Sequence, residues 1–456
     1  MSRIAIYSFT TLIILLIPYS GQAQEKTLSD AKKAFDNGQL EEALDVYSMI
    51  YKKDSTYIPS ILGISKVYTQ MNKVDQALLW TDKAIQLDSA SSTLLYEKAL
   101  IYIKNAYYES ALLCLDQSLE ISPDNSQYLS EKANCLQIVG RHDQAALVYK
   151  QIMDLISMNS KLSVADFDDL LLKYGVSLLA TNQISLSLKI FEEAKESTNN
   201  QASLYFHMGT AYALDNNIEL GILHFDKAIE KKKNFLEAYI QRAAYNQILN
   251  NYKASIADYS YLLKNTQASS AVYSARGYCQ HQLGKFKQAL SDYDKALAID
   301  TFDQSTLIRR GYAHLKSEHY QLALQDFTKA IQTEGPFTPF ALNNRGETYL
   351  ALNKTDLAMN DIQSSIALDS TNLFAYINLA KTHDKLSEWS EAEKIFENLL
   401  QDNAENPIVI WAYAKSCYQN KKFSRTLKLI SDLKNTPNSI NKKELADMEN
   451  KCKKQL

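Results

Sequence analysis

Apolar residues recur at spacings of three and four along most of this chain. Within the stretch 276–300, for example, Leu290, Tyr293 and Leu297 lie three and four residues apart. This spacing puts apolar side chains on one face of an α-helix, which has 3.6 residues per turn. Two such stretches meet at turn residues such as Gly284. The pattern therefore predicts pairs of antiparallel helices joined by tight turns.

The predicted helix pairs repeat about every 34 residues. The segment 276–300, RGYCQHQLGKFKQALSDYDKALAID, is followed 34 residues later by RGYAHLKSEHYQLALQDFTKAIQTE. One small residue marks the same position in each pair: Ala43, Ala77, Ala111, Ala145, Ser187, Gly221, Ser255, Ala289, Ala323, Ala358, Ala392 and Thr426. Nine of the eleven steps are 34 residues, and the others are 42 and 35. Since one pair cannot cover its own apolar face, the pairs must stack on one another.

At two more positions, the side chain has a similar size in every helix pair. Twelve residues before the marker the chain has Ala31, Ser65, Ala99, Ala133, Gly175, Gly209, Ala243, Gly277, Gly311, Gly346, Ala380 and Ala414. Four residues after it the side chain is large, except at Thr81: Tyr47, Leu115, Tyr149, Phe191, Phe225, Tyr259, Tyr293, Phe327, Ile362, Phe396 and Ile430. Small residues let helices approach closely, so these columns predict a tight seam within each pair.

This pattern resembles the tetratricopeptide repeat. Numbered from residue 270, one unit has the family's residues at positions 4, 8, 15, 20, 24 and 27: Tyr273, Gly277, Gly284, Ala289, Tyr293 and Ala296. Departures occur at Thr81, Thr426 and Gln280. The resemblance covers about residues 24–439 and implies an all-α, right-handed superhelical solenoid of about twelve helix-turn-helix units.

We expect five segments along the chain. They are a signal peptide (1–23), repeats one to four (24–159), an inserted junction with a sub-domain boundary (160–167), repeats five to twelve (168–440) and a C-terminal capping helix or tail (441–456). The junction is predicted from the eight extra residues between the fourth and fifth units.

The N-terminus has the pattern of a secretory signal peptide. Arg3 precedes an apolar segment at about 4–17, and Gly21 and Ala23 stand at positions −3 and −1 of a cut before Gln24. The apolar run is short for a bilayer span, which needs about 20 residues, although an uncleaved anchor stays open. We expect an exported protein that is periplasmic or secreted, or associated with a membrane-bound complex, with no transmembrane segment in the mature chain.

The composition and the motifs of the chain limit which partners and which catalytic activities can be expected. The 49 Lys and Arg nearly balance the 52 Asp and Glu, without a long run of one sign, so no nucleic-acid partner is predicted. Common hydrolase, zinc-protease and nucleotide-binding motifs are missing. His207 and His224 share one unit but lack a third metal ligand. The sequence thus predicts no enzymatic activity, no cofactor and no metal site.

The five cysteines show no CxxC spacing. We expect them to be buried apolar side chains, with Cys452 exposed. Cys114 and Cys135 form the one pair for which a disulfide is worth testing.

Four units carry an arginine just before the small residue and an aspartate sixteen residues later. An anion-binding stripe stays open, but the joint presence of both residues favours structural ion pairs between the two helices of a unit. The predicted pairs are Arg242 with Asp258, Arg276 with Asp292, Arg310 with Asp326, and Arg345 with Asp361.

In the family that the chain resembles, the first helix of each unit lines a concave groove, and its second, fifth, ninth, twelfth and thirteenth positions face a ligand. The resemblance implies the following partner-binding residues: Tyr278, His281, Ile308, Tyr312, Asn343, Glu347, Ile377 and Lys381. This mixture of aromatic and polar side chains suits an extended peptide or a partner helix.

The predicted function is therefore a non-catalytic, exported scaffold for protein–protein interaction. A periplasmic chaperone or assembly factor for secreted or outer-membrane proteins is the alternative. The identity of the partner and the oligomeric state stay open.

Overall fold

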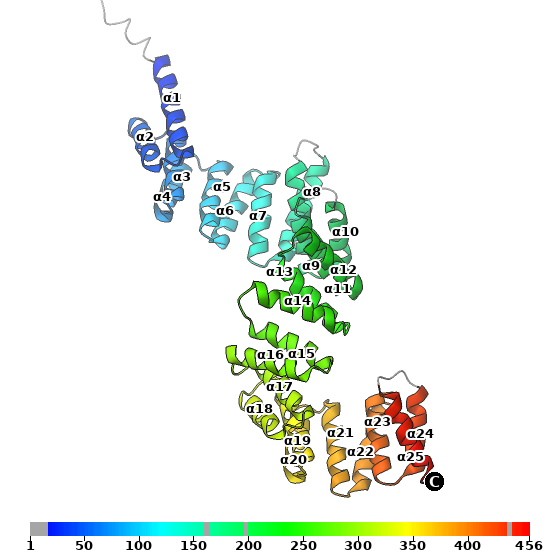
Figure 1. Cartoon of the computed structure of the whole chain (residues 1–456). Helices are drawn as coiled ribbons and strands as arrows, with labels where there is room; N and C mark the ends of the chain where they lie inside the picture. Colours follow the sequence, from blue (N-terminus) through cyan, green and yellow to red (C-terminus); the bar gives the residue numbers. More distant parts are fainter. Residues whose placement is uncertain (1–16, 159–163, 196–198, 436–439) are drawn as a thin grey trace, which may run out of the picture. The chain divides into compact units, whose positions relative to one another are not determined.

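The computed structural model describes residues 17–158, 164–195, 199–435 and 440–456. These residues contain twenty-five α-helices and no β-strand (Figure 1). Over this part of the chain, the helices form twelve hairpins followed by a single last helix. The predicted all-α fold of stacked helix-turn-helix units is confirmed.

The chain divides into two compact units, Met1–Asn234 and Phe235–Leu456. The first contains α1 (Ile17–Asp36), α2 (Leu40–Lys53), α3 (Ile58–Gln70), α4 (Val74–Leu87), α5 (Ser92–Lys104), α6 (Tyr108–Ile121), α7 (Ser126–Ile138), α8 (His142–Met158), α9 (Val164–Ala180), α10 (Ile184–Ala194), α11 (Gln201–Leu214) and α12 (Ile218–Lys231). In each hairpin of this unit the two helices pack on each other and on the next hairpin.

The second unit has the same construction. It contains α13 (Leu236–Ile248), α14 (Tyr252–Asn265), α15 (Ser270–Gln282), α16 (Phe286–Ile299), α17 (Gln304–Lys316), α18 (Tyr320–Gln332), α19 (Thr338–Ala351), α20 (Thr355–Leu368), α21 (Leu373–Lys385), α22 (Trp389–Asp402), α23 (Pro407–Gln419), α24 (Phe423–Asn435) and α25 (Lys442–Lys453). All four hairpins with the predicted arginine and aspartate residues belong to this unit.

The extra residues between the fourth and fifth hairpins lengthen two helices. The helices α8 and α9 have 17 residues each, whereas α6 and α7 have 14 and 13. One cluster of buried apolar residues continues from Tyr96 to Ala211, through helices on both sides of this place. Residues 160–163 of the predicted junction lie outside the described part, so the boundary at 160–167 stays a prediction.

Each hairpin turn has one residue in the left-handed backbone conformation. Its φ lies between 56° and 79°, and eight of the twelve positions hold Gly or Asn, which adopt this conformation with little strain. The full set is Gly38, Asn72, Ala106, Gly140, Asn182, Asn216, Asn250, Gly284, Glu318, Asn353, Ser387 and Lys421. A turn in this conformation returns the chain antiparallel, which explains why the hairpins are alike although their turn sequences differ.

The seam inside each hairpin is as close as the small residues predict. A Cβ added to Gly311 would lie 2.8 Å from Cε1 of Phe327, and one added to Gly277 would lie 2.8 Å from Cε1 of Tyr293. Both rings are buried. Where the hairpin holds Ser65 and Thr81 instead, their hydroxyl oxygens are 2.6 Å apart. A hydrogen bond thus replaces ring packing at the position where the large residue was missing.

The four arginines and four aspartates are in contact, and each arginine donates two hydrogen bonds to its aspartate. The shortest distances are 2.6 Å (Arg242 Nη2 to Asp258 Oδ1), 2.7 Å (Arg276 Nε to Asp292 Oδ2), 2.7 Å (Arg310 Nη2 to Asp326 Oδ1) and 2.7 Å (Arg345 Nε to Asp361 Oδ2). The aspartate side chains are only 4–7% exposed. This geometry is that of bidentate structural pairs between the two helices of a hairpin.

Three of these arginines also bind the preceding hairpin, which the sequence pattern did not predict. Their Nη1 atoms donate to Ser260 Oγ (3.0 Å, from Arg276), Asp294 Oδ1 (2.7 Å, from Arg310) and Thr328 Oγ1 (3.2 Å, from Arg345). In the first unit, lysines at the equivalent position contact the preceding hairpin alone, as in the pair of Lys98 Nζ and Asp82 Oδ1 at 2.7 Å. Arg276, Arg310 and Arg345 therefore each join three helices of the second unit.

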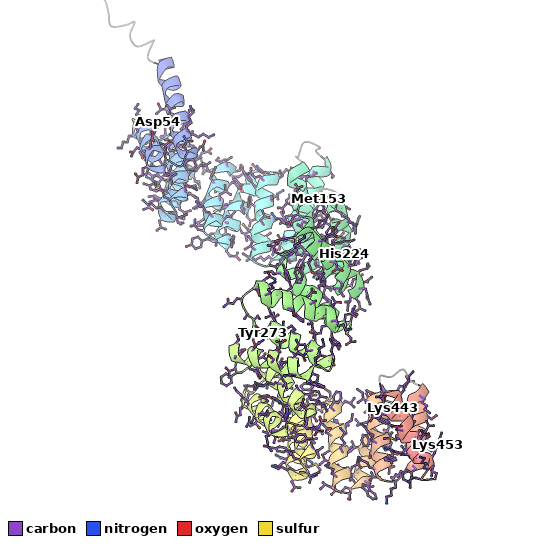
Figure 2. All side chains as sticks on the ribbon, viewed as in Figure 1. Asp54, Met153, His224, Tyr273, Lys443 and Lys453 are labelled. Carbon is purple, nitrogen blue, oxygen red and sulfur yellow. The ribbon has the colours of Figure 1, made fainter. Side chains whose placement is uncertain are left out.

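The last helix, α25, packs on α24, and Figure 2 shows Lys443 and Lys453 on it. Cys452 is fully buried there, so the expectation that it is exposed was wrong. The periodic repeat ends before this helix and gave no sign of the packing. All five cysteines are buried free thiols, Cys114 and Cys135 included.

The two histidines considered as metal ligands have aromatic neighbours. The ring of His207 lies 5.2 Å from that of Phe206, and burial lowers the pKa of His207 to about 4. His224, on α12 (Figure 2), lies 4.8 Å from the ring of Tyr212. Within the described residues, no group of three or more His, Cys, Asp or Glu is placed to hold a metal ion.

None of the helices in the described part is long and apolar enough to cross a membrane.

Candidate functional site

A cavity of about 400 Å³ lies on the second unit. Its walls come mainly from the first helices of four consecutive hairpins, α17, α19, α21 and α23. Capping side chains fix where two of these helices begin, since Asn372 Oδ1 accepts a hydrogen bond from the Ala375 N–H and Asn406 Oδ1 accepts one from the Ile408 N–H. Pro339 stands in the first turn of α19, where its missing N–H is harmless.

The lining of the cavity repeats with the period of the chain. Three columns run across α19, α21 and α23, each with residues 34 apart: Phe340, Phe374 and Ile408; Asn343, Ile377 and Trp411; Glu347, Lys381 and Lys415. The helix α17 adds Tyr312 and Lys316. Because stacked repeats present equivalent positions side by side, the three columns become three parallel stripes.

The stripes differ in exposure. Asn343 and Ile377 are each 3% exposed and form a floor, together with the largely buried Trp411. The first stripe, in contrast, keeps its side chains in solvent: Phe340 is 42%, Phe374 53% and Ile408 47% exposed. The cavity thus has a buried floor and an exposed edge. We call the three exposed residues Phe340, Phe374 and Ile408 the apolar rim.

Hydrogen bonds hold the floor and one wall in place. Asn378 Nδ2 donates to Asn343 Oδ1 at 2.9 Å, and Lys381 Nζ donates to Asn378 Oδ1 at 3.0 Å. Lys316 Nζ contacts Glu347 Oε1 at 3.1 Å. These contacts connect α17, α19 and α21, so the cavity is formed before any partner arrives.

The cavity carries a positive charge. Three lysines (Lys316, Lys381 and Lys415) and one carboxylate (Glu347) line it, which gives 3 − 1 = +2. Burial lowers the pKa of Lys381; the neighbouring Glu347 opposes this, while Lys415 and Lys316 add to it. For Lys316, burial also acts to lower the pKa, but Glu347 and Tyr312 outweigh it and the pKa is raised. Glu347 thus offsets the effect of burial at Lys316 but not at Lys381.

Five of the eight partner-binding residues expected from the sequence line this cavity: Tyr312, Asn343, Glu347, Ile377 and Lys381. The other three do not. The ring of His281 stacks on that of Tyr312, with centroids 5.6 Å apart. The guanidinium carbon of Arg309 lies 5.3 Å from the centre of the Tyr278 ring. Ile308, on α17, packs against buried apolar residues. Tyr278 and His281 are on α15, one hairpin before the cavity begins.

Several lining residues were not named from the sequence, although they stand at positions that the resemblance places in the groove. Phe340, Phe374 and Ile408 occupy the second position of three successive units, and Lys415 occupies the ninth position of the last, 34 residues after Lys381. Their positions in the repeat were the signal that could have identified them. Asn378 gave no such signal, because its sixth position was not expected to face a ligand.

Comparison with known proteins identifies the repeats at three places. Family models of the tetratricopeptide repeat match residues 92–125, 249–304 and 375–407. Protein DIA2 of Eremothecium gossypii is 39% identical over 64 residues, which are 14% of this chain and 9% of that protein. The chain thus spans less than a tenth of the length of this curated relative.

Several solved structures are also similar. The C-terminal part of a TPR repeat-containing protein from Cytophaga hutchinsonii is 17% identical, covers 54% of this chain and 98% of its own, and has a TM-score of 0.46. Yeast Tom70 is 15% identical, covers 95% of this chain and 96% of its own, and has a TM-score of 0.42.

The matched segment 375–407 contains Ile377 and Lys381 of the cavity. Segment 92–125 lies in the first unit and segment 249–304 in the second. Both units thus contain segments that match the tetratricopeptide repeat.

Proposed function

We propose that this protein is a non-catalytic scaffold that binds a segment of another protein in the cavity of its second unit. The observation that carries the proposal is the apolar rim above a preformed floor. Contiguous exposed apolar side chains commonly mark interaction sites, and a buried tryptophan such as Trp411 under them is typical of an energetic centre. Because rigid helices hold the lining, a partner would bind without first ordering the receptor.

Photo-cross-linking tests this proposal in the native host. With a benzophenone amino acid at Phe374, we expect cross-links to a partner protein, because this side chain stands 53% exposed on the apolar rim. The matched control is Phe302, which is 68% exposed and lies outside the cavity. Equal cross-linking from both positions, or none from Phe374, would contradict the proposal.

The same experiment separates a dedicated scaffold from a chaperone. One stoichiometric product supports a scaffold with a single partner. Many products of different mass would support the alternative, a chaperone or assembly factor that binds many clients through the same cavity.

Export is the second part of the proposal. It is supported by the cation, apolar segment and small residues of the N-terminal 23 residues, most of which lie outside the described part. N-terminal sequencing of the protein from a cell-envelope or culture fraction tests it. We expect the chain to begin at Gln24, and a cytosolic chain that begins at the initiator methionine would contradict export.

A further inference from the structure

The apolar rim and the lysines run beside each other along the cavity. On α21, Phe374 and Lys381 are seven residues apart, and on α23 so are Ile408 and Lys415. Seven residues are nearly two helical turns, about 10 Å. A bound segment that lies across both helices therefore meets an apolar stripe along one edge and a cationic stripe along the other.

The charges of the two lysines in this stripe are not balanced within the cavity. Among the described residues, no Asp or Glu oxygen forms an ion pair with Lys381 or Lys415, whereas Lys316 has Glu347. Lys381 donates only to a neutral amide, Asn378, and the ammonium group of Lys415 lies 5.1 Å above the ring of Trp411. Lys381 is exposed and Lys415 is half-buried, so both ammonium groups are accessible to a ligand. Their uncompensated charge is complementary to a ligand that carries carboxylates.

We infer that the segment bound in this cavity is an extended acidic peptide whose Asp or Glu side chains pair with Lys381 and Lys415 while its apolar side chains rest on the apolar rim. This inference rests on the proposed function and names the chemistry of the partner.

The arrangement of the two lysine-bearing helices suits an extended peptide. Packed helices lie about 8–10 Å apart, and an extended chain covers that distance in two to three residues at about 3.3 Å each. Acidic residues with that separation can reach one lysine on each helix.

Two separate lysines suit an acidic segment better than a lone chain terminus. Lys381 and Lys415 come from adjacent helices and have different neighbours, the Asn378 amide and the ring of Trp411. Two acidic side chains of one peptide let each lysine pair with its own carboxylate.

Peptide selection tests the inference while the natural partner is still unidentified. Random twelve-residue peptides displayed on phage are selected on the full-length protein. We expect the bound peptides to be enriched in Asp and Glu together with apolar residues. A Lys381→Gln, Lys415→Gln double variant should lose the acidic enrichment, while Lys394→Gln on the exposed face of α22, outside the cavity, should keep it.

A selected peptide is then measured by fluorescence anisotropy. We expect each lysine substitution to weaken binding about tenfold, added salt to weaken it because charge pairs are screened, and an amidated C-terminus to leave it unchanged. A loss on amidation would show that a terminal carboxylate is bound and would overturn the inference.

The outcomes separate this inference from the proposed function. Neutral or basic peptides that need Phe374 but tolerate the lysine substitutions would overturn the acidic partner and leave the binding cavity intact. Failure to select any peptide that is sensitive to Phe374→Ser would overturn both.

Discussion

Replacing Asp292 by alanine is expected to lower the free energy of unfolding by about 3–5 kcal/mol. Asp292 is 4% exposed in its side chain and accepts two hydrogen bonds, from Nε and Nη2 of Arg276. Its removal leaves a half-buried guanidinium without its carboxylate. The measurement is urea unfolding of the full chain followed by circular dichroism, with the midpoint and slope compared with the parent protein.

Two further variants make this result specific to an unpaired charge. Replacing both Arg276 and Asp292 by leucine removes the charges together and should cost far less than the single change, because apolar groups replace a buried ion pair at little net loss. Asp82→Ala breaks a more exposed pair with Lys98 in the first unit and should cost less than about 1 kcal/mol. If the single and double variants were equally destabilised, the pairs would contribute through packing alone.

Replacing Phe327 by alanine is expected to destabilise the protein by about 3–5 kcal/mol. The ring is fully buried, and it covers Gly311 so closely that no Cβ fits between them. Its loss opens a void at the centre of the hairpin formed by α17 and α18. The same unfolding experiment measures the effect.

A double-mutant cycle shows whether the two positions are matched. Gly311→Ala alone forces a contact of 2.8 Å with Phe327 and should destabilise the protein. In the Phe327→Ala background the space is vacant, so the same change should be neutral or stabilising, since alanine favours the helix by about 1 kcal/mol over glycine. Additive effects of the two changes would contradict the matched seam.

The sequence predicted the hairpins well because one physical requirement is repeated twelve times. Each hairpin needs small residues at its seam and apolar residues on its stacking faces, so the pattern is visible although individual positions vary. The spacing of sixteen residues also predicted the contact of Arg310 with Asp326. Its contact with Asp294 was not predictable, because the partner at that position changes identity from one hairpin to the next.

The location of the cavity was less predictable than the face on which it lies. The fifth and ninth positions pointed to Asn343 and Lys381, but equally to Ile308 and Tyr278, which lie outside the cavity. A hollow forms only where neighbouring side chains leave space. Whether such space is left depends on the combined size of side chains from several helices. The residues at any single position of the repeat do not show this.

Substitutions at some of the left-handed turn residues are expected to make this protein more stable to heat. At Ala106, Glu318, Ser387 and Lys421 the turn requires a conformation that a side chain with a Cβ disfavours, and glycine or asparagine fills the other eight turns. These four sites lie outside the lining of the cavity. An engineer could therefore raise the melting temperature at the hairpin ends without altering the surface that recognises a partner.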